Sequence, residues 1–297
     1  MADGTALRDA PPPARDGVRR PRDHGSMLRR GVAIGALLAV LAVALTGAAG
    51  AATPPSSPSL GILFSEGMTA RQMTDRVSAV RRIAIAKRHV RPVLTAKSYA
   101  AALTQIAPPR GFAGAKRGSL EGFLFPSLYK FGASTTAAEL VGQQLAAFGS
   151  AWSKVDLADA RARGRTPYQV LIVASMVERE TVAPEERPLV AAVIYNRLAK
   201  DMPLGIDATI RYGLGIPGTR PLTKAELTTD SPYNTDLNKG LPPTPIGNPG
   251  AASLRAAAHP ANVDYLYYVR MPDKVHHFFT ADEAEFCQKA AEYGYGC

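Results

Sequence analysis

Two glutamates, Glu178 and Glu180, directly follow an apolar run in the segment LIVASMVERET, residues 171–181. The seven apolar or small residues before them are typical of a buried helix. A carboxyl group at the end of such a helix lies between core and solvent, where it can transfer a proton to a bound substrate. The simpler interpretation of Glu178 is an ion pair with Arg179 or another neighbour, which is common on protein surfaces. Both interpretations are open at this point.

Further polar side chains that could bind a substrate are spread along the chain. Asn196 falls on the apolar face of a predicted helix, where its amide needs hydrogen-bond partners. The other candidates lie in or near loops, and each alone is more often a cap, a turn residue or a satisfied core group: Glu121, Asp207, Tyr233, Asn234, Asn248 and His277. Amide, hydroxyl and aromatic side chains on long loops suit a neutral, hydroxyl-rich polymer better than a phosphorylated ligand.

Patterns for other kinds of site do not occur in the sequence. It has no metal-ligand spacing, no glycine-rich phosphate loop and no nucleophile elbow. We therefore expect neither a metal nor a cofactor.

The elements that position these residues are predicted to be helices with a few strands. Residues 60–80 predict a short strand, a glycine turn and an amphipathic helix, and the aromatic segment LEGFLFPSLYKF, residues 120–131, is expected to be extended. Further helices are expected at residues 94–106, 136–150, 151–163, 166–180 and 184–202. Residues 203–262, rich in Gly, Pro, Asn and Thr, read as a long loop system. A strand at 263–271 precedes a second strand and a helix within 276–293. Because helices and strands do not alternate regularly, the expected class is α+β.

The net charge of +10 is concentrated in the first half of the chain. Residues 71–117 contain eleven Lys or Arg and one acidic residue, whereas residues 118–297 contain 17 basic and 19 acidic residues. This distribution predicts a compact basic module at 60–117 and a nearly neutral domain at 118–297. The neutral domain argues against a nucleic-acid partner. The basic module suits an anionic surface, unless it is an ordinary solvated face.

The N-terminal region predicts export of the main body. Residues 1–30 are rich in Arg, Pro, Asp and Gly and are expected to form a disordered cytoplasmic tail. Residues 31–52 contain no charged side chain and would be about 33 Å long as a transmembrane helix. Arg29 and Arg30 precede this segment and no Lys or Arg follows it until Arg71, so the positive-inside rule predicts a cytoplasmic N-terminus. A cleaved signal peptide is the alternative. The segment TPPSSPS, residues 53–59, reads as a linker.

The two cysteines, Cys287 and Cys297, both lie at the C-terminal end. In an exported protein they could close a small loop, and two free thiols are the alternative. Neither has candidate ligands or bases beside it in the sequence, so we expect no catalytic or metal-binding role for them.

Ordered motifs give the chain a specific resemblance over residues 60–297. They are LEGFLFPSLY, ASMVERET, VIYNRL, LGIDATIRYGLG, SPYNTDLNKGLPPTPIGNPG, LRAAAHPA and YLYYVR followed by HHFFT. Together they resemble the YceG-like family of endolytic murein transglycosylases. The resemblance implies a bacterial, membrane-anchored extracytoplasmic enzyme with a LysM-like module at 60–117 before the catalytic domain at 118–297. It also implies that Glu178, within ASMVERET, is the catalytic acid.

The implied reaction cuts the bond between N-acetylmuramic acid and N-acetylglucosamine within nascent glycan strands and so limits their length. It needs one carboxyl group, because the C6 hydroxyl of the muramic acid is the nucleophile. Glu180, Asp207 and Glu121 remain candidates for a second carboxyl group, although Glu180 points about 200° away from Glu178 around a helix. A membrane tether and a short linker would hold the cleft near newly made polymer, which makes wall polymerases such as penicillin-binding proteins expected partners.

The sequence also departs from the family pattern. The family usually has Asp at Ser127, Gln at Gly205, Pro at Ala208 and an aromatic residue at Asp236. These departures concern subsite preference more than the reaction. A lysozyme-like hydrolase and a non-catalytic wall-binding division protein are the alternative functions.

Overall fold

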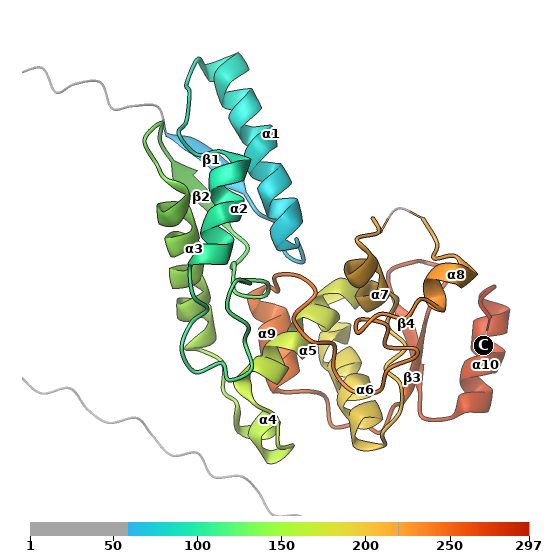
Figure 1. The fold of residues 1–297 in the computed structure, drawn as a ribbon. Helices are drawn as coiled ribbons and strands as arrows, with labels where there is room; N and C mark the ends of the chain where they lie inside the picture. The colour runs from blue at the N-terminus through green and yellow to red at the C-terminus, as the bar shows by residue number, and fades with distance from the viewer. Residues whose placement is uncertain (1–58, 219, 297) are drawn as a thin grey trace, which may run out of the picture. The chain divides into compact units, whose positions relative to one another are not determined.

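The computed structural model describes residues 59–218 and 220–296. The predicted tail at 1–30, the predicted span at 31–52 and residues 53–58 of the predicted linker lie outside them. Within the described part, no helix is both long and apolar enough to cross a membrane. This part is α+β, as expected, with helices and two separate two-stranded antiparallel sheets (Figure 1).

Five elements form the first part of the described chain. They are β1 (Leu60–Leu63), α1 (Ala70–Arg88), α2 (Ala96–Gln105), β2 (Leu128–Phe131) and α3 (Ala137–Trp152). Each helix follows a threonine, Thr69, Thr95 or Thr136, whose hydroxyl accepts a hydrogen bond from the backbone N–H three residues on. These capping boxes satisfy backbone donors that have no partner inside a helix, which explains where the helices begin.

The first sheet crosses the boundary that the sequence predicts at residues 117 and 118. β1 pairs antiparallel with β2, so that Leu60 lies opposite Phe131. Buried side chains from both sides of the boundary pack in one apolar cluster, among them Ile62, Met73, Tyr99, Leu120, Leu124, Tyr129 and Leu140. The predicted module at 60–117 therefore shares its core with residues 120–141.

The second part of the chain contains the remaining helices and a hairpin. In order they are α4 (Ala158–Ala162), α5 (Pro167–Glu180), the 3₁₀ turn η1 (Pro184–Glu186), α6 (Arg187–Ala199), α7 (Asp207–Leu214), α8 (Lys224–Leu227), α9 (Ala251–Ala258), β3 (Tyr267–Arg270), β4 (His277–Thr280) and α10 (Glu283–Glu292). The strands and helix expected within 263–293 correspond to β3, β4 and α10. Cys297, the second cysteine of the predicted loop closure, lies outside the described part.

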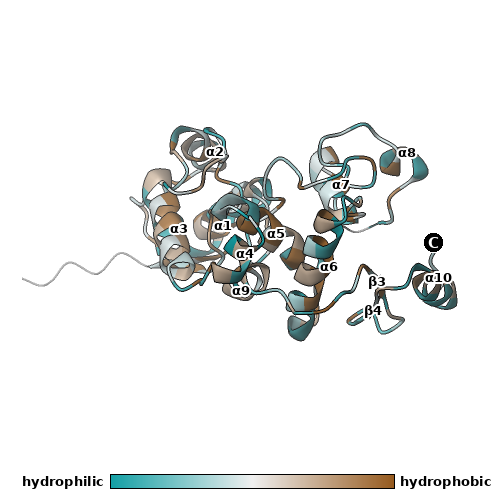
Figure 2. Ribbon diagram, turned by 90° about the horizontal axis from the view of Figure 1, so that it is seen from below, coloured by the Kyte–Doolittle hydropathy of each residue, from teal (hydrophilic) through white to brown (hydrophobic). Residues whose placement is uncertain are grey.

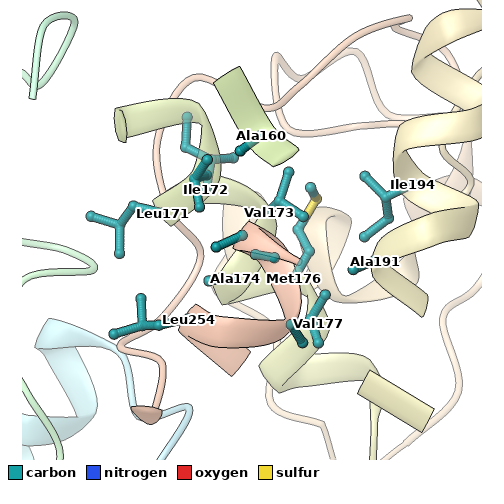
Figure 3. Close-up of a cluster of buried hydrophobic side chains, with 14 of the residues drawn as sticks. Ala160, Leu171, Ile172, Val173, Ala174, Met176, Val177, Ala191, Ile194 and Leu254 are labelled. Atoms are coloured by element: carbon teal, nitrogen blue, oxygen red, sulfur yellow. The ribbon is translucent and has the colours of Figure 1, made fainter. Parts of the chain in front are cut away.

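Helix α5 is the centre of the second apolar cluster. Thr166 caps it and Pro167 opens it, and every residue from Val170 to Val177 is buried. Figure 3 shows Leu254 of α9 and Ile194 of α6 among the apolar side chains that surround α5. A helix that is apolar on all sides needs neighbours on all sides, and these two helices supply them.

Residues 203–262 contain more helix than the sequence predicts, because α7, α8 and α9 all lie within this range. Helices of four to eight residues are too short to show a clear apolar period. The local signals are instead Gly250 at the N-cap of an alanine-rich segment and Gly215, whose positive φ of 67° ends α7. Figure 2 shows the outlying α8 and α10 as more hydrophilic than α5.

Deletion of residues 60–117 should prevent cooperative folding of the remaining chain. The deletion removes the partner strand of β2 and exposes Leu120, Leu124 and Leu140, each at most 1% exposed in the intact structure. Thermal unfolding followed by circular dichroism should then show a broad transition or aggregation. A sharp transition near that of the intact protein would show that residues 118–297 fold independently.

Candidate active site

The C-terminal end of α5 sends three charged side chains in different directions. Its last residues are Glu178, Arg179 and Glu180, and Thr181 leaves the helix with extended dihedral angles. Since successive residues are about 100° apart around a helix, each of the three side chains meets a different neighbourhood. The chemistry available at this end depends on those three neighbourhoods.

Glu178 stabilises the start of α9. One carboxylate oxygen accepts a hydrogen bond from the Gly250 N–H at 2.9 Å, and the other lies 3.7 Å from Nη2 of Arg187. Its side chain is only 6% exposed. The backbone N–H at the N-terminus of α9 and the arginine both stabilise a negatively charged carboxylate. The structure thus shows Glu178 in an ion pair, although with Arg187 rather than Arg179.

A second carboxyl group lies close to Glu178. Partial desolvation, and next the charge of Glu178, raise the pKa of Glu66, while Arg187 opposes the shift. A side chain at position 250 would overlap the Glu66 carboxylate, so Gly250 is needed for this approach. No sequence pattern marks Glu66 except the glycine that follows it. In the structure this glycine, Gly67, has a positive φ of 75°.

Glu180 has a different set of neighbours from Glu178. Burial raises the pKa of its carboxyl group, and the nearby Asp207 raises it further, against hydrogen bonding from Tyr268 and the charges of Arg270 and Arg179. The Tyr268 hydroxyl donates to Oε2 of Glu180 at 3.1 Å. A carboxyl group that retains its proton at higher pH is suited to act as a general acid.

Arg179 connects the helix end to a cavity of about 320 Å³. Its Nη1 donates to the Gly67 carbonyl at 3.2 Å. The cavity lies between the start of α1 and α7, and its lining includes Arg71, Glu121, Arg179, Arg211, Tyr212, Tyr233 and Ile246. Of these, only Glu121 and Tyr233 are residues that the sequence singled out. The two arginines of α1 and α7 and Tyr212 had no sequence signal beyond their place near a motif.

Glu121 is a buried carboxyl group at the inner side of this cavity. It accepts hydrogen bonds from the Ala70 N–H, from the Tyr212 hydroxyl at 3.2 Å and from the Asn248 amide at 2.8 Å. Burial raises the pKa of Glu121 to about 7, although these hydrogen bonds oppose the shift. Glu121 therefore changes its charge close to neutral pH.

Asn248 is fully buried and joins three segments. Its amide nitrogen donates to Glu121 and to the Met68 carbonyl, and its amide oxygen accepts from the Leu124 N–H. Its backbone N–H donates to Met68, and its carbonyl accepts from the Gly67 N–H at 2.9 Å. Asn248 thus positions Glu121 and does not itself line the cavity.

The neighbouring glycine allows the two backbones to come this close. A side chain at Gly247 would lie 2.8 Å from the Gly67 carbonyl oxygen. Glycine at 247 therefore leaves room for the hydrogen bonds between residues 67–68 and Asn248.

The remaining predicted site residues lie in three kinds of place. Tyr233 lines the cavity and shares a hydrogen bond of 2.8 Å with Thr244. Asp207 is exposed at the start of α7, near Glu180 and 3.9 Å from Arg211. Asn196, Asn234 and His277 make contacts that hold the fold: Asn196 donates to the Val263 and Tyr265 carbonyls, Asn234 to those of Leu227 and Thr229, and His277 binds the buried Glu186 carboxylate.

The departures from the family pattern lie in different places. Gly205 has a positive φ of 62°, and a side chain there would lie 3.1 Å from Nη1 of Arg197 and 3.9 Å from Asp236. Partial burial, and next Asp207, raise the pKa of Asp236. Ser127 is exposed just before β2, and Ala208 is buried in α7. Asp236 is therefore the departure that adds a charge near Asp207.

No group of three or more His, Cys, Asp or Glu side chains in residues 59–218 and 220–296 is arranged to hold a metal ion.

Glu121→Gln should make the free energy of unfolding less dependent on pH. Because the folded state raises this pKa from 4.5 to about 7, the contribution of Glu121 to stability is highest below pH 4.5 and is lost as the pH rises through 7. Each pH unit within that window is worth up to about 1.4 kcal/mol. Chemical denaturation between pH 4.5 and 8 should show a flatter profile for Glu121→Gln than for the exposed control Glu185→Gln. Equal slopes would mean that Glu121 does not titrate there.

Comparisons with known proteins agree with this architecture. A sequence profile of the YceG-like family matches residues 38–292. An endolytic murein transglycosylase of Bacillus subtilis is 38% identical over 150 residues, which are 50% of this chain and 41% of that protein. One of Streptococcus pneumoniae is 32% identical over 179 residues, 59% and 32% of the two chains. The chain thus matches less than half the length of these relatives.

A solved structure gives the same result for the fold. The crystal structure of a putative yceG-like protein from Listeria monocytogenes matches with a TM-score of 0.61 and 28% identity, covering 77% of this chain and 75% of that one. Since the family profile also covers most of the sequence, the chain belongs to the YceG-like family.

Proposed function

We propose that this protein is an endolytic lytic transglycosylase of murein, which cuts the bond between N-acetylmuramic acid and N-acetylglucosamine within glycan strands. Membership of the YceG-like family and the names of the two relatives support this activity. The observation that carries the chemistry is the Glu178 side chain, which is only 6% exposed at the end of α5 and lies close to a second carboxyl group, that of Glu66.

Glu178 is the proton donor in this proposal, and Glu180 is the competing assignment. The Gly250 N–H and Arg187 hold the Glu178 carboxyl group in place, and the family resemblance of the segment ASMVERET favours it as the catalytic acid. Glu180 instead receives a hydrogen bond from Tyr268 and lies near a second acidic residue, Asp207. Burial raises the pKa of Glu180, which is the observation that favours the competing assignment.

The reaction requires one carboxyl group that acts twice. Protonated Glu178 gives its proton to the leaving oxygen as the bond from that oxygen to C1 of the muramic acid breaks. The C6 hydroxyl oxygen of the same sugar then bonds to C1, and the Glu178 carboxylate takes the hydroxyl proton. The products are a 1,6-anhydro end and a free hydroxyl end, and no water is consumed.

Asp207 favours one alternative. Its exposed carboxylate near Glu180 could activate a water molecule, as the second carboxyl group of a hydrolase does. Hydrolysis would leave reducing ends instead of anhydro ends. Mass spectrometry of the released fragments distinguishes the two reactions.

Glu178→Gln should reduce the cleavage rate by about a hundredfold or more, because the amide keeps the shape and loses the proton. Glu180→Gln should reduce it by less than about tenfold, since the amide oxygen can still accept the hydrogen bond from Tyr268. Glu185→Gln serves as an exposed control. The reverse order of the two effects would assign the proton transfer to Glu180. Full activity in both variants would leave a non-catalytic, wall-binding role.

The location of the enzyme is also a proposal. Residues 31–52 would span the membrane with the N-terminus in the cytoplasm, and residues 53–59 would link this anchor to the described part. Residues 60–117, with β1, α1 and α2, would form the LysM-like module, and β2 pairs with its strand β1. Such a tether keeps the active site close to newly made strands and to wall polymerases, because a seven-residue linker reaches only about 15 Å.

A soluble exported form that begins at residue 60 should cut murein strands in solution but should not restore normal strand length in cells that lack the enzyme. The tether, rather than the cleft, would then choose nascent strands. Chromatography of glycan strands from complemented cells measures the outcome, with the full chain as the control. Full restoration by the soluble form would rule out a role of the tether in substrate choice.

A further inference from the structure

The cavity beside the end of α5 carries an excess of positive charge. Three arginines line it, Arg71 from α1, Arg179 from α5 and Arg211 from α7, and the acidic residue among its lining is Glu121. With a pKa of about 7, Glu121 is not fully ionised at neutral pH. Such a charge would add little to the binding free energy of neutral sugar units, whereas it would strengthen the binding of an anionic group through charge-assisted hydrogen bonds.

The three guanidinium groups are fixed in place by backbone carbonyls. Arg71 donates to Gly215 at 3.1 Å, Arg179 to Gly67 at 3.2 Å and Arg211 to Arg220 at 2.8 Å. A guanidinium group has five N–H donors, so these contacts leave further donors for a ligand. Side chains that are already held lose less conformational entropy when a ligand binds.

The other walls of the cavity suit an organic ligand. Tyr212 and Tyr233 lie with their ring centroids 5.1 Å apart, and Ile246 contributes an apolar surface. A volume of about 320 Å³ is at the lower end of the range for small-molecule sites. The cavity thus combines apolar walls with fixed cationic groups, which fits a short peptide with free carboxylates.

We propose that this cavity binds the peptide of the murein strand through its carboxylates, with Arg71 and Arg211 as specificity-determining residues. The inference rests on the proposed function. In murein, the muramic acid carries the peptide on its lactyl group, and C1 of the same sugar is the carbon whose bond breaks. The peptide must therefore lie beside the proton donor. The cavity meets this requirement, because Arg179, which lines it, and Glu178 both lie beside Gly67: a side chain at position 67 would meet Cγ of Glu178 at 3.5 Å and Cδ of Arg179 at 3.6 Å.

Equilibrium binding of a small fragment to the full chain tests the proposal. The probe is the disaccharide N-acetylglucosaminyl-N-acetylmuramic acid with its peptide attached, which does not contain the bond between muramic acid and a following sugar. The comparison probe is the same compound with its peptide carboxylates amidated. The variants are Arg71→Gln and Arg211→Gln, and the matched control is Arg82→Gln, an exposed arginine of α1 outside the cavity.

Each cavity variant should weaken binding of the free-carboxylate probe by about tenfold and should largely remove the preference over the amidated probe. Arg82→Gln should change neither. Equal binding of both probes by the unmodified protein would overturn the proposal, and so would equal losses in the cavity and control variants. Displacement of the probe by inorganic pyrophosphate at a lower concentration than by the free peptide would instead assign the cavity to a phosphate group.

This binding assay is independent of cleavage. If the protein fails to cut strands but the arginine variants lose the carboxylate preference, the proposed reaction is wrong and the peptide site stands. If it cuts strands and shows no carboxylate preference, the reaction stands and the peptide site is wrong.

Discussion

The buried amide of Asn248 is the interaction on which the candidate active site depends. It connects residues 67–68 before α1, residues 121–124 before β2 and the loop that begins α9. An unpaired buried polar group costs about 1–3 kcal/mol. Loss of any one of these segments would leave part of the buried Asn248 amide unpaired and would destabilise its contacts with the others. Because Asn248 also orients Glu121, the geometry of the cavity is fixed by the same contacts that hold the first part of the chain to the second.

The two glutamates of α5 show how neighbours assign different roles to identical side chains. They lie two residues apart, yet Glu178 faces an arginine and a helix N-terminus, whereas Glu180 faces a tyrosine and an exposed aspartate. The sequence places both at the end of one apolar helix and contains no information about which partners they meet. Those partners come from α6, α7, α9 and β3, which lie up to 90 residues further along the chain.

Local patterns predicted much of the fold. The apolar run of α5 with its Thr166 cap, the capped helices α1 to α3, and the final hairpin and helix were visible in the sequence. The pairing of β1 with β2 was not, because no local signal selects a partner strand more than 60 residues away. The short helices α7 and α9 were also missed, and with them Arg211 and Tyr212, because eight residues are too few to establish a period.

The close contact between Gly67 and Gly247 has a consequence for motion. Side chains are excluded there, and backbone hydrogen bonds join residues 67–68 to Asn248 in both directions. Because backbone atoms form this contact, no side chain there can change its rotamer and so let the two segments shift past each other. Separation of α1 from α9 would break these bonds together with those to Glu121, as in local unfolding rather than hinge bending. The position of the start of α1 relative to the start of α9 is therefore set by the fold, so the cavity that the start of α1 lines already exists before any ligand binds.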